Sequence, residues 1–306
     1  MDDRRAPKVS AIIATKDRLD MLRRAVAAIV EQAYDGVVET IVVMDGGPEP
    51  DDLQSHDPRR PIRIVPNKRK PGLPGARNTG ILEAEGDLIA FCDDDDVWQS
   101  NKLSAQVALL SERPDVMLAV TGMTVVWNGR RIPRVWSADT LSLADFVRSR
   151  VQEVHPSSFV WRREAFEAIG LVDEELPGAY GEDWDLLIRI ARCSDVGNVP
   201  CSLVDVHWHP GTFFMDKWAI IAQAIDYSLQ KHPELTESRH GHALLLGRQS
   251  FAQAACGDRG PAFRTAVRSL RLWPGDRRAW TAIVVASGLI SAERAQKLAN
   301  SVGRGI

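Results

Sequence analysis

The chain has 306 residues, a formal net charge of -3 and a hydrophobic fraction of 44%. The length suits one large or two modest domains, and the apolar share is ample for a globular core. The absence of excess positive charge argues against a nucleic-acid partner. We expect a cytoplasmic protein, because the N-terminus lacks the apolar stretch of a secretory signal and no apolar run could form a transmembrane segment. The four cysteines have no paired spacing that would indicate a disulfide framework or a zinc site.

Short apolar runs alternate with helical patterns in the first half of the chain. Strands are expected at residues 9–14, 40–44, 62–65 and 88–92, and helices at 19–33 and 76–85. This alternation predicts an α/β domain with a mostly parallel, Rossmann-like central sheet. In such sheets ligands bind beyond the carboxyl ends of the strands, so Asp45 and the aspartates at 93–96 should face one crevice.

The middle of the chain is less regular, and the last third is helical in pattern. Strands are expected at 117–127, 131–135, 159–161 and 199–206, and helices at 164–169, 182–192, 218–230, 241–256, 262–272 and 278–290. The domains are therefore expected at 1–213 and 214–306. Part of the tail resembles one degenerate tetratricopeptide unit, but a plain helical appendage is preferred because stacked arrays need about three repeats.

Four consecutive aspartates, Asp93 to Asp96, follow the apolar run 88–92. Adjacent ionised carboxylates repel one another and cannot be buried without a counter-charge. At a strand end over a crevice, Mg²⁺ or Mn²⁺ is the natural partner, because these cations take oxygen ligands. The other interpretation is a solvated acidic turn, which the Val-Trp pair that follows directly makes less favoured.

A second acidic cluster, Glu182-Asp183-Trp184-Asp185, opens an apolar helix after a Gly-rich loop. The helix dipole favours acidic residues in a first turn, so this cluster alone could be structural. Together with the upstream aspartates it indicates a division of roles, in which one carboxylate set holds a metal and the other supplies a general base.

Three further positions are candidates for binding. His207 and His209, two residues apart near an expected strand end, would point to one face, where either could bind a metal or phosphate or be a plain surface residue. Arg77 follows the Gly-rich run 72–75 at a helix start, where backbone can approach an anion. Neither a Walker P-loop nor a GxGxxG run is present, which weakens ATPase and dinucleotide-binding interpretations.

Five segments, in order, resemble glycosyltransferase family 2. They are residues 12–18 (IIATKDR), 42–46 (VVMDG), 75–80 (GARNTG), 93–98 (DDDDVW) and 181–185 (GEDWD). Each segment is weak alone, but five in this order and rough spacing are a strong signal. The resemblance covers about residues 8–213 and implies a GT-A fold, which the C-terminal helices would extend, and an inverting glycosyltransferase.

The resemblance also implies roles at the nucleotide end of the site. Thr15, Asp17, Arg18 and Asp45 would hold the base and ribose, with Asp45 accepting a hydrogen bond from the ring N–H of uracil. Arg77 would lie near the base or phosphate. Asp93 or Asp94 would contact the ribose.

For the chemistry, Asp95 matches the principal metal ligand of the family, and Asp96 is the adjoining candidate. His207 or His209 falls near a metal or diphosphate contact of some members. Asp183 matches the general base, and Glu182 would position it. The implied cofactor is Mn²⁺ or Mg²⁺.

The expected donor is a nucleotide diphosphate sugar, with UDP-sugar favoured. A glycan, a lipid-linked saccharide or a small molecule could be the acceptor, and the helical tail could mediate a homodimer. Three other functions stay open at this point: a haloacid dehalogenase-type phosphatase, because Asp93-x-Asp95-x-Val97 fits its string, a sugar-nucleotide pyrophosphorylase or nucleotidyltransferase, and a non-catalytic nucleotide-sugar binding module.

Overall fold

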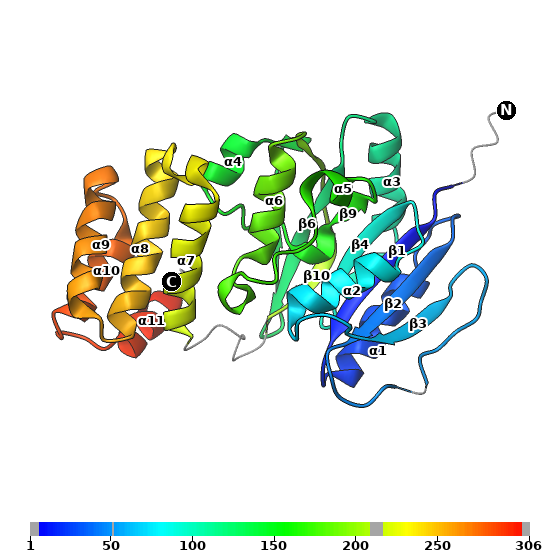
Figure 1. Cartoon of the computed structure of the whole chain (residues 1–306), viewed down its shortest axis with the longest axis horizontal. Coiled ribbons are helices and arrows are strands. Elements are labelled where there is room, and N and C mark those ends of the chain that lie inside the picture. The colour runs from blue at the N-terminus through cyan, green and yellow to red at the C-terminus, as the bar shows by residue number, and fades with distance from the viewer. Residues whose placement is uncertain (1–5, 51, 209–216, 302–306) are drawn as a thin grey trace. The chain divides into compact units, whose positions relative to one another are not determined.

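A computed structural model of the protein describes residues 6–50, 52–208 and 217–301 (Figure 1). The chain divides into two compact units. The first comprises residues 1–143, 151–174 and 182–209, and the second comprises residues 144–150, 175–181 and 210–306. The boundary expected at residue 213 lies outside the described residues.

The first unit is built on a sheet with the strand order β3-β2-β1-β4-β9-β6-β10-β5. Off this path, β7 pairs with β6 and β8 pairs with β10. Six of the described strands run in one direction: β1 (Val9–Thr15), β2 (Val38–Met44), β3 (Ile62–Pro66), β4 (Leu88–Asp93), β6 (Leu118–Trp127) and β10 (Val196–His207). Four others run the opposite way: β5 (Val97–Trp98), β7 (Arg130–Arg134), β8 (Thr140–Leu141) and β9 (Val160–Arg162). The prediction of a mostly parallel α/β domain is confirmed.

Helices cover this sheet (Figure 1). They are α1 (Leu19–Val30), α2 (Leu73–Glu83), α3 (Lys102–Glu112), α5 (Ala165–Ile169) and α6 (Glu182–Ala191). Helix α1 buries Leu22, Val26 and Ile29, which recur on one face of a helix. They pack with the apolar side chains of β1, β2 and β4 in one core, which fixes the strand ends that carry the polar residues of the site.

The second unit is helical in its described part. It contains most of α4 (Leu143–Arg148), followed by α7 (Trp218–Lys231), α8 (Arg239–Ala255), α9 (Arg259–Leu272), α10 (Arg277–Ala286) and α11 (Ala292–Ser301). Small residues such as Ala262, Ala266 and Ala282 are fully buried where α8, α9 and α10 pack together. The predicted helical extension is confirmed. Nowhere in the described part of the chain is a helix long and apolar enough to span a membrane.

Five short or partly polar elements were not expected from the sequence. They are β5, α3, β8, α4 and α11. Helix α2 also begins at Leu73, earlier than expected, because Pro74 is compatible with a first helical turn and extends it into the Gly-rich run.

Candidate active site

The carboxyl ends of β1, β2 and β4 lie side by side and bring together three of the predicted site segments. The register pairs Thr15 with Met44 and Ala14 with Asp93. The backbone N–H of Asp45 donates to the carbonyl of Thr15 at 2.8 Å. The polar loops that follow these strands therefore share one edge of the sheet, as the α/β pattern predicts.

Asp45 is held in place by the loop after β3. Its carboxylate accepts hydrogen bonds from Asn67 Nδ2 at 2.7 Å and from the N–H of Gly72 at 2.9 Å. Gly47 has a φ of +83°, and a Cβ there would lie 2.8 Å from the carbonyl of Lys16 and from Asp17 Oδ1. Only glycine suits this backbone and this close approach, so the Asp45 loop and the loop with exposed Asp17 lie against each other.

Thr15 and Arg18 hold two of the four aspartates. Asp94 is buried and accepts a hydrogen bond from Thr15 Oγ1 at 2.6 Å and from Arg18 Nε at 3.2 Å. Asp95 accepts from Arg18 Nη1 at 2.7 Å. Burial raises the pKa of Asp95 to about 7, and the carboxylates of Asp96 and Asp93 add to the rise. A second positive charge beside Asp95 would therefore be favourable.

Asp96 accepts three hydrogen bonds and is 1% exposed. The donors are Ser157 Oγ at 2.6 Å, His155 Nδ1 at 3.2 Å and the backbone N–H of His207 at 3.3 Å. Burial lowers the pKa of His155, but the Asp96 and Asp93 carboxylates outweigh it and raise that pKa to about 9. Sequence reasoning missed His155, because a single histidine in an irregular segment carries no spacing that marks it.

Arg77 joins the two acidic clusters. Its guanidinium is buried, donates to Asp93 Oδ1 at 2.6 Å and to Glu182 Oε1, and lies 5.2 Å from the centre of the Phe91 ring. Burial lowers the pKa of Arg77, but Glu182 and Asp93 hold it above its usual value. Burial raises the pKa of Glu182 to about 7 despite this pairing. Arg77 thus ties the end of β4 to the start of α6.

Two of the remaining predicted residues lie at the same place. Asp183 is half-buried next to Glu182, and its charge contributes to the raised pKa of His155. His207 is the last residue of β10. Its Nε2 lies 3.3 Å from Arg24 Nη2, and its backbone contacts Asp96. His209 lies outside the described residues.

The charges of this site suit a divalent cation. Six carboxylates gather there, from residues 93–96, 182 and 183, against the guanidinium groups of Arg18 and Arg77 and the imidazole of His155. The ligand atoms of Asp93, Asp96 and His155 lie within 4.8 Å of one another and could hold a metal ion. Because carboxylate oxygens predominate, a hard ion such as Mg²⁺ or Mn²⁺ fits the site.

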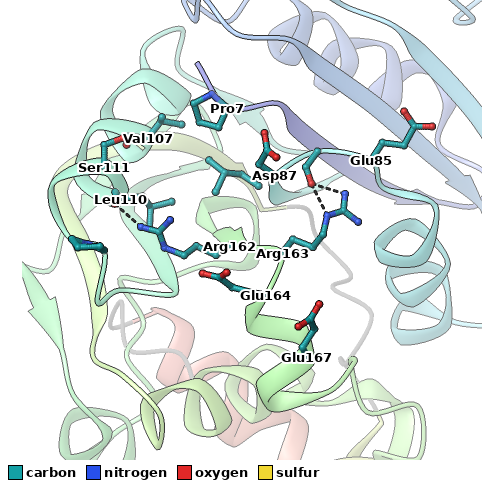
Figure 2. A pocket seen from close by; sticks show the side chains of 13 residues that line it. Pro7, Glu85, Asp87, Val107, Leu110, Ser111, Arg162, Arg163, Glu164 and Glu167 are labelled. Atoms are coloured by element: carbon teal, nitrogen blue, oxygen red, sulfur yellow. Dashed lines mark hydrogen bonds between the residues drawn. The ribbon is translucent and has the colours of Figure 1, made fainter. Parts of the chain in front are cut away.

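A cavity of about 880 Å³ lies at the other end of β4, beside Leu88 (Figure 2). Arg163 Nε donates to the carbonyl of Gly86 at 2.7 Å, and Arg162 Nη2 donates to that of Leu110 at 2.6 Å. Four carboxylates, from Glu85, Asp87, Glu164 and Glu167, also line the cavity, so its charge does not favour an anionic ligand. It is separate from the aspartates, which follow the carboxyl end of the strand.

Residues 10–170 match the family model of glycosyl transferase family 2, and the chain belongs to this family. The glycosyltransferase YwdF of Bacillus subtilis is 31% identical over 64% of this chain and 73% of its own length. The succinoglycan biosynthesis protein ExoO of Rhizobium meliloti is 28% identical over 62% of this chain, and the match spans 57% of that protein. The protein is therefore a glycosyltransferase.

Two solved structures share the fold at low sequence identity. S. aureus TarS 1–349, in complex with UDP, has a TM-score of 0.58 and 17% identity, with 95% of this chain and 92% of that chain covered. The mannosyltransferase PcManGT of Pyrobaculum calidifontis, in complex with GDP-Man and Mn²⁺, has a TM-score of 0.59 and 16% identity, with 95% and 87% covered. These likenesses and the family match confirm the expected GT-A fold.

Proposed function

We propose that the protein transfers a sugar from a nucleotide diphosphate sugar, with UDP-sugar favoured, to a hydroxyl of an acceptor, with inversion at the anomeric carbon. The observation that carries this proposal is the Arg77 bridge, which joins Asp93 to Glu182 and so places both acidic clusters in one site. The complex of TarS with UDP and that of PcManGT with GDP-Man and Mn²⁺ support a nucleotide sugar donor.

The loops after β1 and β2 are the proposed nucleotide site. Asp45 would accept the ring N–H of the base, since Asn67 and Gly72 already fix the orientation of its carboxylate. Thr15, Asp17 and Arg18 would line the same pocket. Asp93 or Asp94 would accept from the ribose hydroxyls. Uracil is favoured by the resemblance to the family, and the complex of TarS with UDP supports it.

The aspartate cluster is the proposed site of Mn²⁺ or Mg²⁺. Asp95 and Asp96 are the predicted ligands, with His207 or His209 as a further contact, and the geometry adds Asp93 and His155 as alternatives. A bound divalent cation would neutralise the negative charge that develops on the diphosphate leaving group. Arg18 would place a further positive charge beside this group, because its guanidinium already faces Asp94 and Asp95.

Asp183 is the proposed general base. A carboxylate at the start of α6 would take the proton of the acceptor hydroxyl as that oxygen attacks the anomeric carbon. Glu182 would position it, because Arg77 holds Glu182 in the buried start of the helix. Attack from this side, opposite the diphosphate, inverts the anomeric carbon in a single displacement.

A donor screen tests the proposal. Nucleotide sugars are incubated with the protein and Mn²⁺, and released nucleotide diphosphate is followed with and without a chelator. We expect slow release from a UDP-sugar, its loss with chelator, and loss of metal-dependent UDP binding in Asp95→Asn. Asp115→Asn, an exposed carboxylate paired only with Arg113 among the described residues, is the control. If Asp95→Asn still binds UDP in a metal-dependent way and His155→Ala does not, the metal site is instead formed by Asp93, Asp96 and His155.

The base is tested with Asp183→Asn once a donor is known. Turnover should fall by a factor of roughly 10²–10⁴, the usual contribution of a positioned general base. The affinity for UDP should stay about the same as that of the parent. Asp185→Asn, in the same helical turn, is measured beside it. Near-parental turnover in Asp183→Asn would refute the assignment.

Self-association and location are also proposals. Large apolar side chains, including Phe263, Trp280 and Leu298, are exposed on α9, α10 and α11, which supports a homodimer through these helices. Sedimentation of the parent and of the double variant Phe263→Ser, Trp280→Ser tests the homodimer. The parent should sediment as a dimer and the variant as a monomer, and a monomeric parent would contradict the proposal. A cytoplasmic location stays a prediction.

A further inference from the structure

Two exposed tryptophans occupy adjacent positions at the carboxyl ends of β6 and β10. These strands are parallel neighbours, and their register ends with Val126 paired to His207. The N–H of Trp208 then donates to the carbonyl of Val126 at 3.0 Å. Trp127 and Trp208 therefore stand at the same edge of the sheet as the aspartate cluster.

Both indole rings are unusually open to solvent. Trp127 is 41% exposed and Trp208 is 42% exposed. The neighbouring hairpin strand β7 adds Ile132, which is 45% exposed. Single exposed apolar residues are common on protein surfaces, whereas a group of them in one place indicates a binding surface.

Arginines accompany the two tryptophans. Arg130 pairs directly across the hairpin with Trp127. The guanidinium carbon of Arg134 lies 4.9 Å from the centre of a Trp208 ring, which orients the indole by a cation–π contact. Within the described residues neither arginine forms a salt bridge, whereas Arg131 is bound by Asp205 at 2.7 Å. We call Trp127, Trp208, Arg130 and Arg134 the aromatic platform.

The aromatic platform is continuous with the proposed catalytic site. His207, the residue before Trp208, donates its backbone N–H to Asp96 at 3.3 Å. Trp208 is therefore bonded directly to the residue whose backbone holds Asp96. The platform also lies apart from the loops after β1 and β2, which are the proposed nucleotide site.

We propose that the aromatic platform binds the acceptor, and that this acceptor is a saccharide bearing a phosphate group. The inference rests on the proposed function and narrows its acceptor. The flat faces of Trp127 and Trp208 suit the C–H faces of sugar rings. Arg130 and Arg134, which form no salt bridge within the described part of the chain, offer positive charge to phosphate oxygens. A lipid surface could also contact exposed tryptophan and arginine side chains. The direct link from Trp208 through His207 to Asp96 favours a substrate of the proposed catalytic site instead.

The test uses the full chain with UDP and Mn²⁺. Binding of a panel of hexose 1-phosphates, of the matching methyl glycosides and of phosphatidylglycerol vesicles is measured by saturation-transfer NMR and co-sedimentation. We expect the parent to bind at least one hexose phosphate better than its methyl glycoside. Trp208→Ala and Trp127→Ala should weaken this binding by roughly tenfold, whereas Trp208→Phe should keep most of it. Arg134→Gln should remove the preference for the phosphate.

Trp280→Ala, which removes another exposed tryptophan, is the matched control and should bind the sugar phosphates as the parent does. The proposal is overturned if the parent binds no member of the panel, if the platform variants bind it normally, or if they lose only vesicle binding. UDP release by the parent is measured separately. Sugar phosphate binding without UDP release would refute the proposed function and leave the platform supported, and the reverse result would refute the platform alone.

Discussion

Arg77 is the residue on which the charge balance of the site depends most. It is 2% exposed and its two partners, Asp93 and Glu182, come from segments almost a hundred residues apart in the chain. The Glu182 carboxylate is buried and that of Asp93 is partly buried, so both ionised groups depend on the guanidinium for a counter-charge. The same contact therefore serves the fold and the site.

Arg77→Met should lower the free energy of unfolding by roughly 3–5 kcal/mol, the usual cost of leaving a buried charge without its partner. Arg77→Lys should cost less, but still lose stability, because an ammonium group cannot donate in the planar fork that reaches both carboxylates. Urea denaturation of the three proteins measures this. Equal stability of Arg77→Met and the parent would show that Glu182 and Asp93 are neutral or solvated.

A second buried basic side chain, Lys102, predicts a pH dependence of stability. Its Nζ lies 3.9 Å from the centre of the Trp98 ring, and burial lowers its pKa to about 7. The unfolded chain keeps the ordinary pKa of 10.5, so the unfolded state binds the proton more tightly. The resulting penalty is absent above the unfolded pKa, grows as pH falls toward 7, and is constant below it.

Lys102→Met should therefore be more stable than the parent at pH 6.5. This advantage should shrink between pH 7 and 10, because the parent lysine gives up its proton on folding and the free energy of that loss falls as pH rises, by about 1.4 kcal/mol per pH unit at most. Urea denaturation of both proteins at pH 6.5, 8 and 9.5 measures the difference. Other titrating groups are common to both chains and cancel. A difference independent of pH would contradict a buried, neutral lysine.

The identities of the carboxylates could be predicted from sequence, but not their separate environments. Four consecutive aspartates after an apolar run are enough to predict a cation site at a strand end. The structure gives each aspartate different donors: Arg77 for Asp93, Thr15 for Asp94, Arg18 for Asp95 and Ser157 for Asp96. These donors come from distant segments, and no local pattern encodes which one reaches which carboxylate.

At the scale of elements, helix α2 shows how closely the site helix must approach the sheet. Gly80 faces β1, and a Cβ there would lie 2.3 Å from Ile12 Cγ2. Since Arg77 lies one turn earlier on the same helix, its position depends on this approach. A glycine in the middle of a helix is otherwise unfavourable, so the packing explains its presence.

Gly80→Ala should destabilise the protein by roughly 1–3 kcal/mol, because the overpacking cost exceeds the gain in helix propensity. Gly260→Ala in α9 is the control, since a Cβ there meets only the end of the Arg264 side chain, at 3.5 Å. It should be neutral or slightly stabilising. Thermal unfolding followed by circular dichroism compares them, and a stabilised Gly80→Ala would show that α2 can move outward without cost.

The elements that sequence patterns missed have physical reasons in common. Helix α3 buries Lys102 and Gln106 beside Leu103 and Val107, so polar residues interrupt its apolar face. Strands β5 and β8 have two residues each, too few for any alternation. The parallel strands β1, β2 and β4 were predictable because they are buried on both faces and read as continuous apolar runs.

At the scale of the whole molecule, ligand binding should report on the integrity of the site. UDP and Mn²⁺ together should raise the melting temperature, and the stabilisation should reach about 2.7 kcal/mol at a free ligand concentration one hundred times the dissociation constant. A chelator should remove the effect, and Asp95→Asn should show little of it. A shift that is the same with and without metal would contradict a shared site for the cation and the diphosphate.

The second unit depends on segments that lie within the sequence span of the first. A Cβ at Gly241 of α8 would lie 2.0 Å from the carbonyl of Val147, and one at Gly178 would lie 2.3 Å from Ile220 of α7. Gly241→Ala should therefore destabilise the second unit, by roughly 1–3 kcal/mol. Hydrogen exchange resolved by peptide measures this, and protection in α8 and α9 equal to that of the parent would contradict it.

This interleaving limits how the protein can have diversified. The chain passes between its units five times, at residues 143–144, 150–151, 174–175, 181–182 and 209–210. A single genetic crossover could transplant residues 210–306 onto another transferase, but the two short internal segments would stay behind. The recipient would have to supply matching counterparts of Val147 and Gly178. A transfer of residues 210–306 alone would therefore leave these helices without residues 144–150 and 175–181, unless the recipient carries both segments.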